Sequence, residues 1–372
     1  MPEPKKLVIA GGGHASLPLI KMGRKWKKHG IDIKLVSEHP YLIYSGALPQ
    51  YMAGFYEWNQ TSINLEKLCR RYNVLFTAER VKSINKREKL ISTQQENEIP
   101  YDYLVINIGA STAPILEGDE ISPVKPMSKL LQLREKILSG QIGHLLIMGA
   151  GAAGSELALN ISHPGLQHRP QITLVEKESR ILSSFPEKLS LRVRSVLEKR
   201  GVTIHTRISH PNTVPGNFDQ VILAAGNRPR SADLEHSFKT GAEGRILTDH
   251  NMVVDGESNI FAAGDTADIG SENYPQVGVY AVKQGVTLRK NIKSAILGRP
   301  LKPFKPYPVN PLILSNGPNS AFFIMNRFVL EGRMFAVLKY ILDMRWLDKY
   351  SRSTGERRSD FRLFRQGIER SS

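Results

Sequence analysis

Cysteine is nearly absent from this chain, because Cys69 is the only one among 372 residues. A single thiol cannot form an internal disulfide, and it cannot supply the pair of thiols that a redox-active disulfide needs. Cys69 lies within residues 65–71, which we interpret as a helix in which this thiol is an ordinary packing residue. The sequence therefore excludes an enzyme that passes electrons through a cysteine pair of its own.

Long apolar runs are absent as well. No uncharged apolar stretch approaches the roughly 18 residues that a membrane-spanning helix requires. Residues 1–6 run directly into a predicted strand and leave no room for the apolar region of a signal peptide. We therefore expect a cytoplasmic protein.

Motifs of several other enzyme classes are also missing. The chain has no Gly-x-Ser-x-Gly, no His-Glu-x-x-His and no phosphate loop ending in Gly-Lys-Ser. The histidines at 163, 168, 205 and 210 are not spaced from cysteines or paired acids as metal ligands are: His163, His168, His205 and His210. The sequence predicts no metal site.

Acidic residues are few relative to basic ones: 35 Asp and Glu stand against 51 Lys and Arg, for a formal net charge of +16. Such a chain could meet nucleic acid, an anionic membrane or anionic substrates. The positive charge is spread along the chain, and no zinc module or RNA-binding signature accompanies it. We therefore expect no nucleic-acid partner. The length predicts two or three domains.

Two glycine-rich loops stand out against these absences. The first contains Gly11 and Gly13 after the apolar residues 7–10, and the second contains Gly149, Gly151 and Gly154 after residues 145–148. A buried parallel strand, a glycine turn and a helix form the fingerprint of a dinucleotide site, where backbone must approach a diphosphate closely. Two loops therefore predict two dinucleotides, and two adjacent cofactors suggest electron transfer between them.

The two loops begin two copies of one supersecondary unit. In the second copy Glu176 ends the next strand, where a carboxylate can accept both hydroxyls of an adenine ribose. In the first copy Ser37 takes that place and Glu38 follows, so either residue could bind the ribose, and we favour Glu38. Each copy closes with a strand that ends in glycine, at Gly109 and Gly226.

A further departure lies in the first loop. Its third glycine is replaced by Ser16, at a position where helix and strand pack closely. We therefore expect a slightly wider turn in this loop than in the second.

The motifs together resemble the two-dinucleotide-binding-domain flavoproteins, the pyridine nucleotide-disulfide oxidoreductase superfamily. The resemblance is carried by the two loops and by residues 259–265, Asn-Ile-Phe-Ala-Ala-Gly-Asp. Residues 44–49, 279–285 and 338–343 look like type II NADH dehydrogenases and like the FAD-dependent dehydrogenase-like proteins associated with selenide, water dikinase. The resemblance implies an α/β fold with two Rossmann-like domains, FAD in the first and NADH in the second, with NADPH less favoured.

The resemblance also implies domain boundaries. Residues 1–118 and 245–320 would form a discontinuous FAD domain, and residues 119–244 would form the NAD(P)H domain. Residues 321–372 would form a C-terminal segment that either lies on the inner face of the cytoplasmic membrane or packs on the FAD domain. Its charges do not fall on one clean helical face, so both alternatives stay open.

Several residues gain roles from this resemblance. Asp265 would accept a hydrogen bond from a ribityl hydroxyl, although it could also be a simple helix N-cap. Glu156 would orient the nicotinamide carboxamide, or be only a favourable acid near a helix N-terminus. Tyr280 and Gln284 would line an acceptor pocket, or merely pack in the flavin domain. The remaining predicted cofactor contacts are Gly11, Gly13, His14, Ala15, Glu38, Ser45, Gly109, Gly149, Gly151, Gly154, Glu176, Gly226, Gly264, Gln276, Val277 and Gly278.

The sequence thus predicts an NADH:acceptor oxidoreductase that passes a hydride from NADH to FAD and electrons onward to a quinone. The alternatives are a reductase of a protein carrier or of a selenium or sulfur compound, and a flavin redox sensor. The oligomeric state stays open.

Overall fold

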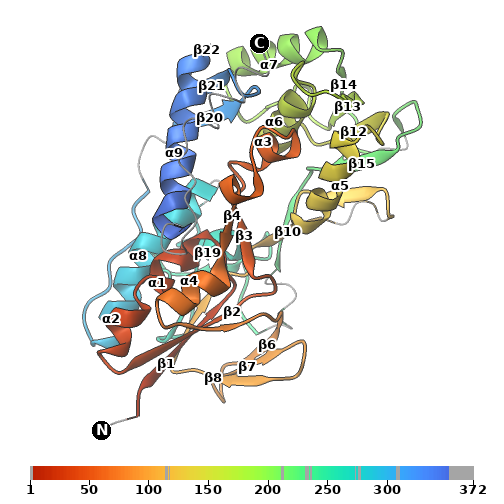
Figure 1. Ribbon diagram of the computed structural model, residues 1–372. Coiled ribbons are helices and arrows are strands. Elements are labelled where there is room, and N and C mark those ends of the chain that lie inside the picture. The colour runs from red at the N-terminus through yellow and green to blue at the C-terminus, as the bar shows by residue number, and fades with distance from the viewer. Residues whose placement is uncertain are drawn as a thin grey trace.

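The computed structural model describes residues 3–113, 116, 118–210, 213–230, 234, 237–272, 274, 278–306 and 311–351. Two five-stranded parallel sheets organise these residues, one in each half of the molecule (Figure 1). We call them the first sheet and the second sheet. The predicted α/β class with two Rossmann-like units is confirmed.

The first sheet holds the strands that flank the first glycine loop. Its order is β18-β9-β1-β2-β5, with bounds Ile260–Ala262, Tyr103–Ile106, Lys5–Ala10, Ile31–Val36 and Leu75–Thr77. The chain enters this sheet from both sides of the second unit, because β18 pairs in parallel with β9. Residues 259–265 therefore return to the first sheet, as the sequence predicted.

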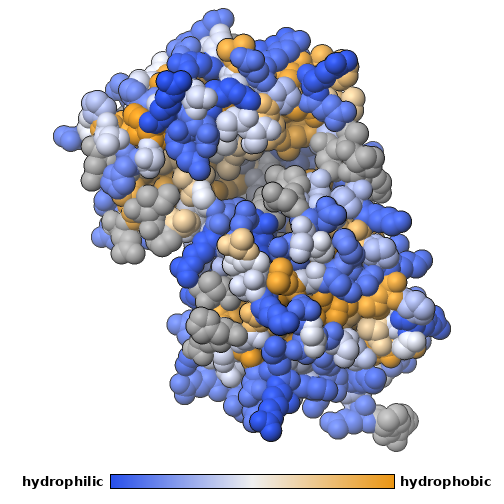
Figure 2. Space-filling model, turned by 180° about the vertical axis from the view of Figure 1, so that it is seen from behind, coloured by the Kyte–Doolittle hydropathy of each residue, from blue (hydrophilic) through white to orange (hydrophobic). Residues whose placement is uncertain are grey.

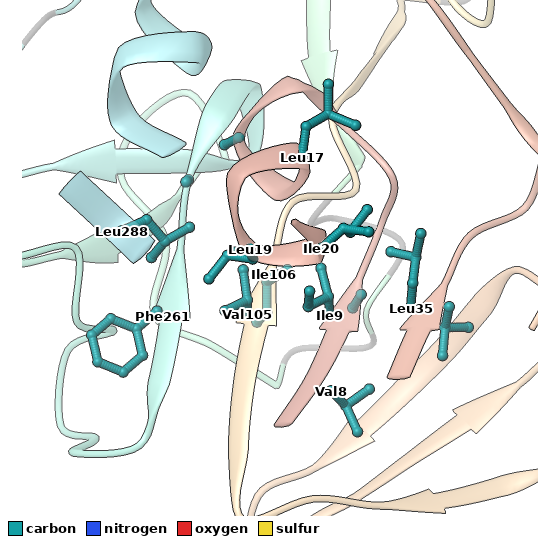
Figure 3. Close-up of a cluster of buried hydrophobic side chains, with 14 of the residues drawn as sticks. Val8, Ile9, Leu17, Leu19, Ile20, Leu35, Val105, Ile106, Phe261 and Leu288 are labelled. Atoms are coloured by element: carbon teal, nitrogen blue, oxygen red, sulfur yellow. The ribbon is translucent and has the colours of Figure 1, made fainter. Parts of the chain in front are cut away.

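Apolar side chains on both faces make these strands a buried core. Leu7, Ile9 and Leu35 are fully buried, as expected for parallel strands that helices cover on both faces. Short helices follow the first loop: η1 (His14–Ser16), α1 (Leu17–Ile20) and α2 (Gly23–Lys27). Figure 3 shows Leu17, Leu19 and Ile20 above the strands, with Phe261 and Leu288 closing the same cluster.

The second sheet repeats this arrangement. Its order is β11-β15-β12-β13-β14, with bounds Ile121–Pro123, Gln220–Leu223, His144–Met148, Gln171–Glu176 and Thr203–Thr206. Helices α6 (Ala152–Ile161) and α7 (Glu187–Lys199) follow β12 and β13. The second glycine loop joins β12 to α6, so a helix begins directly after it.

A narrow junction connects the two sheets. Strands β10 (Ala110–Thr112) and β16 (Asn227–Pro229) pair antiparallel there, and each directly follows one of the glycine-ended strands. Seen from behind, the molecule forms two lobes with a hollow between them (Figure 2).

The remaining helices and strands lie outside the two parallel sheets and the junction. They are β3 (Tyr41–Ile43), α3 (Leu48–Met52), η2 (Trp58–Gln60), β4 (Ser62–Asn64), α4 (Leu65–Arg71), β6 (Val81–Asn85), β7 (Leu90–Thr93), β8 (Glu98–Pro100), α5 (Ser128–Leu138), β17 (Ile246–Thr248), η5 (Gly264–Thr266), β19 (Ala267–Ile269) and α8 (Gly278–Ile296).

The C-terminal part spans both lobes. An antiparallel sheet of β20 (Leu312–Ser315), β21 (Ala321–Met325) and β22 (Phe328–Gly332) packs on the second lobe, and α9 (Arg333–Ser351) runs from it along the side of the molecule towards α8 (Figure 1). Helix α9 buries Lys339 and Asp343 but leaves Met334 70% and Leu342 50% exposed. Charged side chains are thus buried and apolar ones exposed on this helix, which explains why its sequence shows no clean polar face. None of the described helices is long and apolar enough to span a membrane.

Candidate nucleotide and electron-transfer site

The first glycine loop is held against the end of β9. A Cβ on Gly11 would lie 2.2 Å from the Asn107 carbonyl oxygen, and one on Gly13 would lie 2.7 Å from the Asn107 side chain. Ser16 donates its hydroxyl to the Gly11 carbonyl at 2.7 Å, and Asn107 Nδ2 donates to Ser16 Oγ at 2.9 Å. The loop therefore needs its glycines for packing against the neighbouring strand, in addition to any ligand.

The second loop closes more tightly. A Cβ on Gly154 would lie 1.9 Å from the Gly149 carbonyl oxygen, whereas Ser16 places a real side chain at the corresponding point of the first loop. This contrast is consistent with the wider first turn that the sequence predicts. A Cβ on Gly151 would meet nothing within 4 Å, so open space lies where a dinucleotide diphosphate would approach.

Glu176 is fixed by backbone groups of its own lobe. Its carboxylate accepts from the Ala150 N–H at 2.7 Å and from the Glu178 N–H at 3.1 Å, and the residue is buried. Arg180 donates to three carbonyls, of Leu182, Ser183 and Phe185. The Glu176 carboxylate is therefore held at the end of β13 beside the second loop, and the Arg180 guanidinium is bound to backbone carbonyls.

Glu38 lies in a groove beside the first loop and pairs across the junction. The groove is lined by Gly11–Gly13, Ser37, Glu38 and Arg230, among others. Arg230 Nη2 lies 2.8 Å from Glu38 Oε2, and the Arg230 backbone N–H donates to the Gly109 carbonyl at 3.1 Å. Burial acts to raise the pKa of Glu38, but the hydrogen bond and charge of Arg230 lower it on balance. The carboxylate therefore stays ionised.

Asp265 stands at the start of the turn η5, near the junction. Lys125 Nζ contacts Asp265 Oδ2 at 2.5 Å, and the Lys125 backbone is tied to Thr112 of β10 by two hydrogen bonds. The Gly264 N–H donates to Gln284 Oε1 at 2.7 Å. Gln284 therefore holds the turn that carries Asp265. This contact matches the packing role that the sequence left open for Gln284 more closely than a role in lining an acceptor pocket.

His14 begins η1 inside a cluster of aromatic rings. Its ring stacks on Trp346 with centroids 5.2 Å apart and lies 5.9 Å from Tyr44, while Nε2 is buried without a hydrogen-bond partner. Burial lowers the pKa of His14 to about 4, so the imidazole is neutral at neutral pH. A Cβ on Gly278, the first residue of α8, would lie 3.2 Å from Ser45 Oγ and 3.9 Å from His14 Nε2. The structure thus brings Ser45 and His14 to the beginning of α8.

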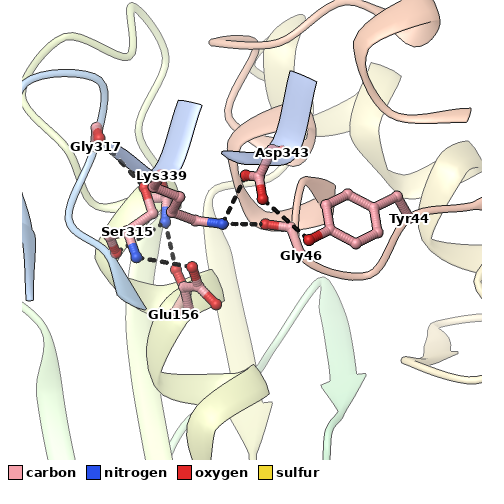
Figure 4. A network of polar contacts seen from close by, with 8 residues as sticks. Tyr44, Gly46, Glu156, Ser315, Gly317, Lys339 and Asp343 are labelled. Carbon is pink, nitrogen blue, oxygen red and sulfur yellow. Dashed lines mark hydrogen bonds and ion pairs between the residues drawn. The ribbon is translucent and has the colours of Figure 1, made fainter. Parts of the chain in front are cut away.

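Glu156 lies beside a buried polar network that joins distant parts of the chain (Figure 4). Glu156 Oε1 accepts from the Ser315 N–H at 2.7 Å. Lys339 Nζ donates to the Gly46 carbonyl at 2.6 Å and to Asp343 at 2.9 Å, and Tyr44 donates to Asp343 at 3.0 Å. Burial raises the pKa of Glu156 to about 7, although the charge of Lys339 and the Ser315 N–H oppose this shift.

Other predicted residues have simpler surroundings. Ala15 packs where Gly285 of α8 comes close, since a Cβ on Gly285 would lie 2.6 Å from its carbonyl oxygen. Gly109 donates its N–H to Thr266 Oγ1 at 2.8 Å, and Gly226 precedes β16. Tyr280 is half-buried, with its ring centroid 5.9 Å from that of Tyr274. Gln276 and Val277 lie outside the described residues.

The sequence reasoning missed the residues that join the lobes. Lys339 and Asp343 have the i, i+4 spacing of a helical ion pair within an apolar segment, and that spacing was their available signal. Lys125 and Arg230 had no comparable signal, because their partners lie 140 and 192 positions away.

Comparison with known proteins supports this reading of the fold. The family model described as pyridine nucleotide-disulphide oxidoreductase matches residues 5–285. The type II NADH:quinone oxidoreductase of Staphylococcus aureus is 25% identical over 385 aligned positions, which cover 92% of this chain and 95% of that protein.

Solved structures show the same architecture. NDH2 from Plasmodium falciparum, in complex with NADH, is similar at a TM-score of 0.78 and 14% identity, covering 99% of this chain and 98% of that one. The sulfide:quinone oxidoreductase of Aquifex aeolicus reaches 0.76 at 18% identity, covering 94% and 92%. With its family model matched over both glycine loops, the chain belongs to the pyridine nucleotide-disulphide oxidoreductase family and is an FAD-dependent NAD(P)H oxidoreductase.

Proposed function

We propose that this chain oxidises NADH at the second sheet, with FAD held at the first sheet, and passes the electrons to a quinone. Bound FAD supplies the hydride-accepting ring, and the protein supplies its position and its electrostatic surroundings. The observation that carries the proposal is the pair of glycine loops. The first loop borders a groove that contains Glu38, and the second has open space at Gly151 and Glu176 beside it. With one cysteine in the chain, the electrons must leave through an external acceptor.

The FAD would lie along the groove of the first sheet. Glu38 would accept from its adenine ribose, and the N–H groups that begin η1 would face its diphosphate. Asp265 would accept from the ribityl chain, near Gly109, where a Cβ would meet nothing within 4 Å. The beginning of α8 would face the ring, and its positive dipole would stabilise negative charge there.

NADH would bind at the second loop, with a preference over NADPH. Glu176 is buried and locally held, so a 2′-phosphate would bring like charges together in a low-dielectric place. Arg180 could soften this repulsion through its charge, but it already donates three hydrogen bonds to backbone carbonyls, so we expect a preference for NADH and not exclusion of NADPH. Glu156, on the first turns of α6, would accept from the nicotinamide carboxamide.

The acceptor proposal rests on the relatives and on the C-terminal part. A planar quinone needs no relay to reach a flavin ring, and Tyr280 remains our proposed wall residue for its pocket. Two of the relatives, the NADH:quinone oxidoreductase and the sulfide:quinone oxidoreductase, are named for quinones. Quinones are lipid-soluble, so an apolar surface near the site would help the protein to reach them.

Such a surface is present, and we call it the C-terminal apolar surface. On β21 and β22, Met325, Phe328 and Leu330 share one face of the sheet by register, and this face also carries Phe323, which stacks on Phe335 of α9. Met334, Leu338 and Leu342 repeat every four residues on the exposed side of α9. Exposed Arg327, Arg333 and Arg345 flank these side chains. This combination fits an anionic lipid surface.

Deleting the whole segment would not test membrane binding cleanly, because it would also remove Lys339 and Asp343 from the buried network. We instead propose Leu338→Ser combined with Leu342→Ser. Cosedimentation with anionic liposomes should fall several-fold, while NADH should still reduce the flavin at an unchanged rate. Leu191→Ser on α7, which removes another exposed leucine, is the matched control.

The acceptor itself is tested by anaerobic reduction with NADH, followed by mixing with ubiquinone and menaquinone analogues, a ferredoxin or selenite. Fast reoxidation by quinone only supports the proposal. Faster reoxidation by ferredoxin or by the selenium compound would overturn the quinone assignment. Stoichiometric reduction followed by stalling with every acceptor would favour a redox sensor.

A further inference from the structure

Two ion pairs cross the junction, and each joins a predicted FAD contact to a cation supplied from the side of the second sheet. Arg230 follows β16 and pairs with Glu38 at 2.8 Å, and Lys125 follows β11 and pairs with Asp265 at 2.5 Å. All four side chains are partly buried, with exposed fractions between 20% and 35%. We call them the junction ion pairs.

The proposed placement of FAD gives these cations a function. Glu38 and Asp265 are suited to hydroxyl groups of FAD, but they would also stand beside its diphosphate, which carries two negative charges. Carboxylates close to phosphates repel them, and the repulsion is strong where water is partly excluded. A cation paired with each acid removes that repulsion and leaves a free carboxylate oxygen for a ribose or ribityl hydroxyl.

The backbone geometry holds both cations in place. The Arg230 N–H donates to the Gly109 carbonyl, and the Lys125 N–H donates to Thr112 Oγ1, so both main chains are fixed to the junction ribbon. Arg230 also lines the groove next to Gly11–Gly13. Arg230 thus comes from the chain segment that follows the second sheet, but its positive charge lies in the groove beside the first sheet.

From these observations we infer that Arg230 and Lys125 are positioning residues of the FAD site, so that tight FAD binding depends on the junction and on both lobes. This inference rests on the proposed placement of FAD at the first sheet. It adds a binding contribution from a part of the chain otherwise assigned to NADH.

The test measures FAD affinity of the full chain by fluorescence quenching after flavin removal. Arg230→Gln and Lys125→Gln should each weaken FAD binding by roughly tenfold or more, as expected for loss of a charge-assisted contact. The matched controls are Arg228→Gln, on β16 just before Arg230, and Lys129→Gln; both remove the same charge from exposed positions. NADH affinity should stay unchanged in all four variants.

Salt and a double variant separate electrostatics from simple loss of structure. Added KCl screens repulsion over about 10 Å at 0.1 M, so the difference between Arg230→Gln and the wild type should shrink as salt rises. Combining Glu38→Gln with Arg230→Gln should cost less than the two changes added together. A difference that is independent of salt, or equal losses in Arg228→Gln, would overturn the inference. If the wild type binds no FAD at all, the cofactor placement itself fails instead.

Discussion

The two glycine loops and the acids beside them are held in place by different parts of the chain. In the second loop the tight closure is made by Gly154, and the acid Glu176 is held by N–H groups of its own lobe. In the first loop Ser16 and Asn107 replace the third glycine with hydrogen bonds, and Glu38 depends on Arg230 from across the junction. The ribose acid proposed for the second site is therefore held locally, whereas the one proposed for the first depends on a distant residue.

The largest expected effect breaks the closure of the second loop. Gly154→Ala would place a Cβ 1.9 Å from the Gly149 carbonyl oxygen, so the loop must open and stability should fall by roughly 3 kcal/mol. NADH binding should be lost, as measured by titration alongside thermal unfolding. Gly151→Ala is the comparison, since its Cβ meets no protein atom: it should keep the melting temperature and lose only NADH affinity. Equal melting temperatures for the two variants would refute the tight closure.

A second prediction concerns Glu156 on α6. Because its pKa is about 7, NADH affinity should weaken as pH falls below 7, where the carboxylate becomes protonated and can no longer accept from the carboxamide in the same way. Glu156→Gln should abolish this dependence. An unchanged pH profile in the variant would exclude the residue as its source.

The same group has an effect on stability with a defined sign. Its folded-state pKa lies above its ordinary value of 4.5, so the folded state binds the proton more tightly than the unfolded state. The wild type should therefore lose stability relative to Glu156→Gln as pH rises from about 4.5 through 7. Thermal unfolding at pH 5 and pH 8 measures this difference, and a constant difference between the proteins would contradict it.

A third prediction sharpens the contrast between the two acids. Glu176→Gln should lower NADH affinity roughly tenfold through loss of a charged acceptor, and it should raise the NADPH to NADH ratio by removing repulsion. Glu178→Gln is the control, because Glu178 contributes its backbone N–H and its side chain is exposed. Steady-state flavin reduction with both nucleotides gives the ratio. A ratio unmoved by Glu176→Gln would remove this residue from the ribose site.

The smallest effect is expected at Ser16. Ser16→Ala removes the bond to the Gly11 carbonyl and leaves Asn107 Nδ2 without this acceptor, for a loss of about 1 kcal/mol or somewhat more. Ser155→Ala removes one comparable bond, to the Ala150 carbonyl at 2.9 Å, without leaving a side-chain amide unpaired. Chemical denaturation should therefore show a larger loss for Ser16→Ala. The reverse order would show that the first loop does not depend on this substitute for glycine.

Local patterns allowed much of the fold to be predicted. Largely apolar runs of four residues, followed by glycine or by an acid one or two positions on, indicated the parallel strands β1, β2, β12 and β13 and both loops. These features can be read from sequence because neighbouring residues determine them: a buried strand needs continuous apolar side chains, and a tight turn needs glycine. The same reasoning placed residues 259–265 in the first sheet.

The sequence by itself thus determined the two sheets, the two loops, the acids that follow them and the absence of a cysteine pair. Only the tertiary structure decided which charges serve the site. Lys339 and Asp343 lie in a helix with no clear polar face. They come close to Glu156 because α9 packs against the loop that contains Tyr44 and Gly46. Arg230 meets Glu38 because two chain crossings bring the lobes together at a ribbon of six residues. A buried charge is stable only with its partner, and where that partner lies far along the chain, no local pattern records the pairing.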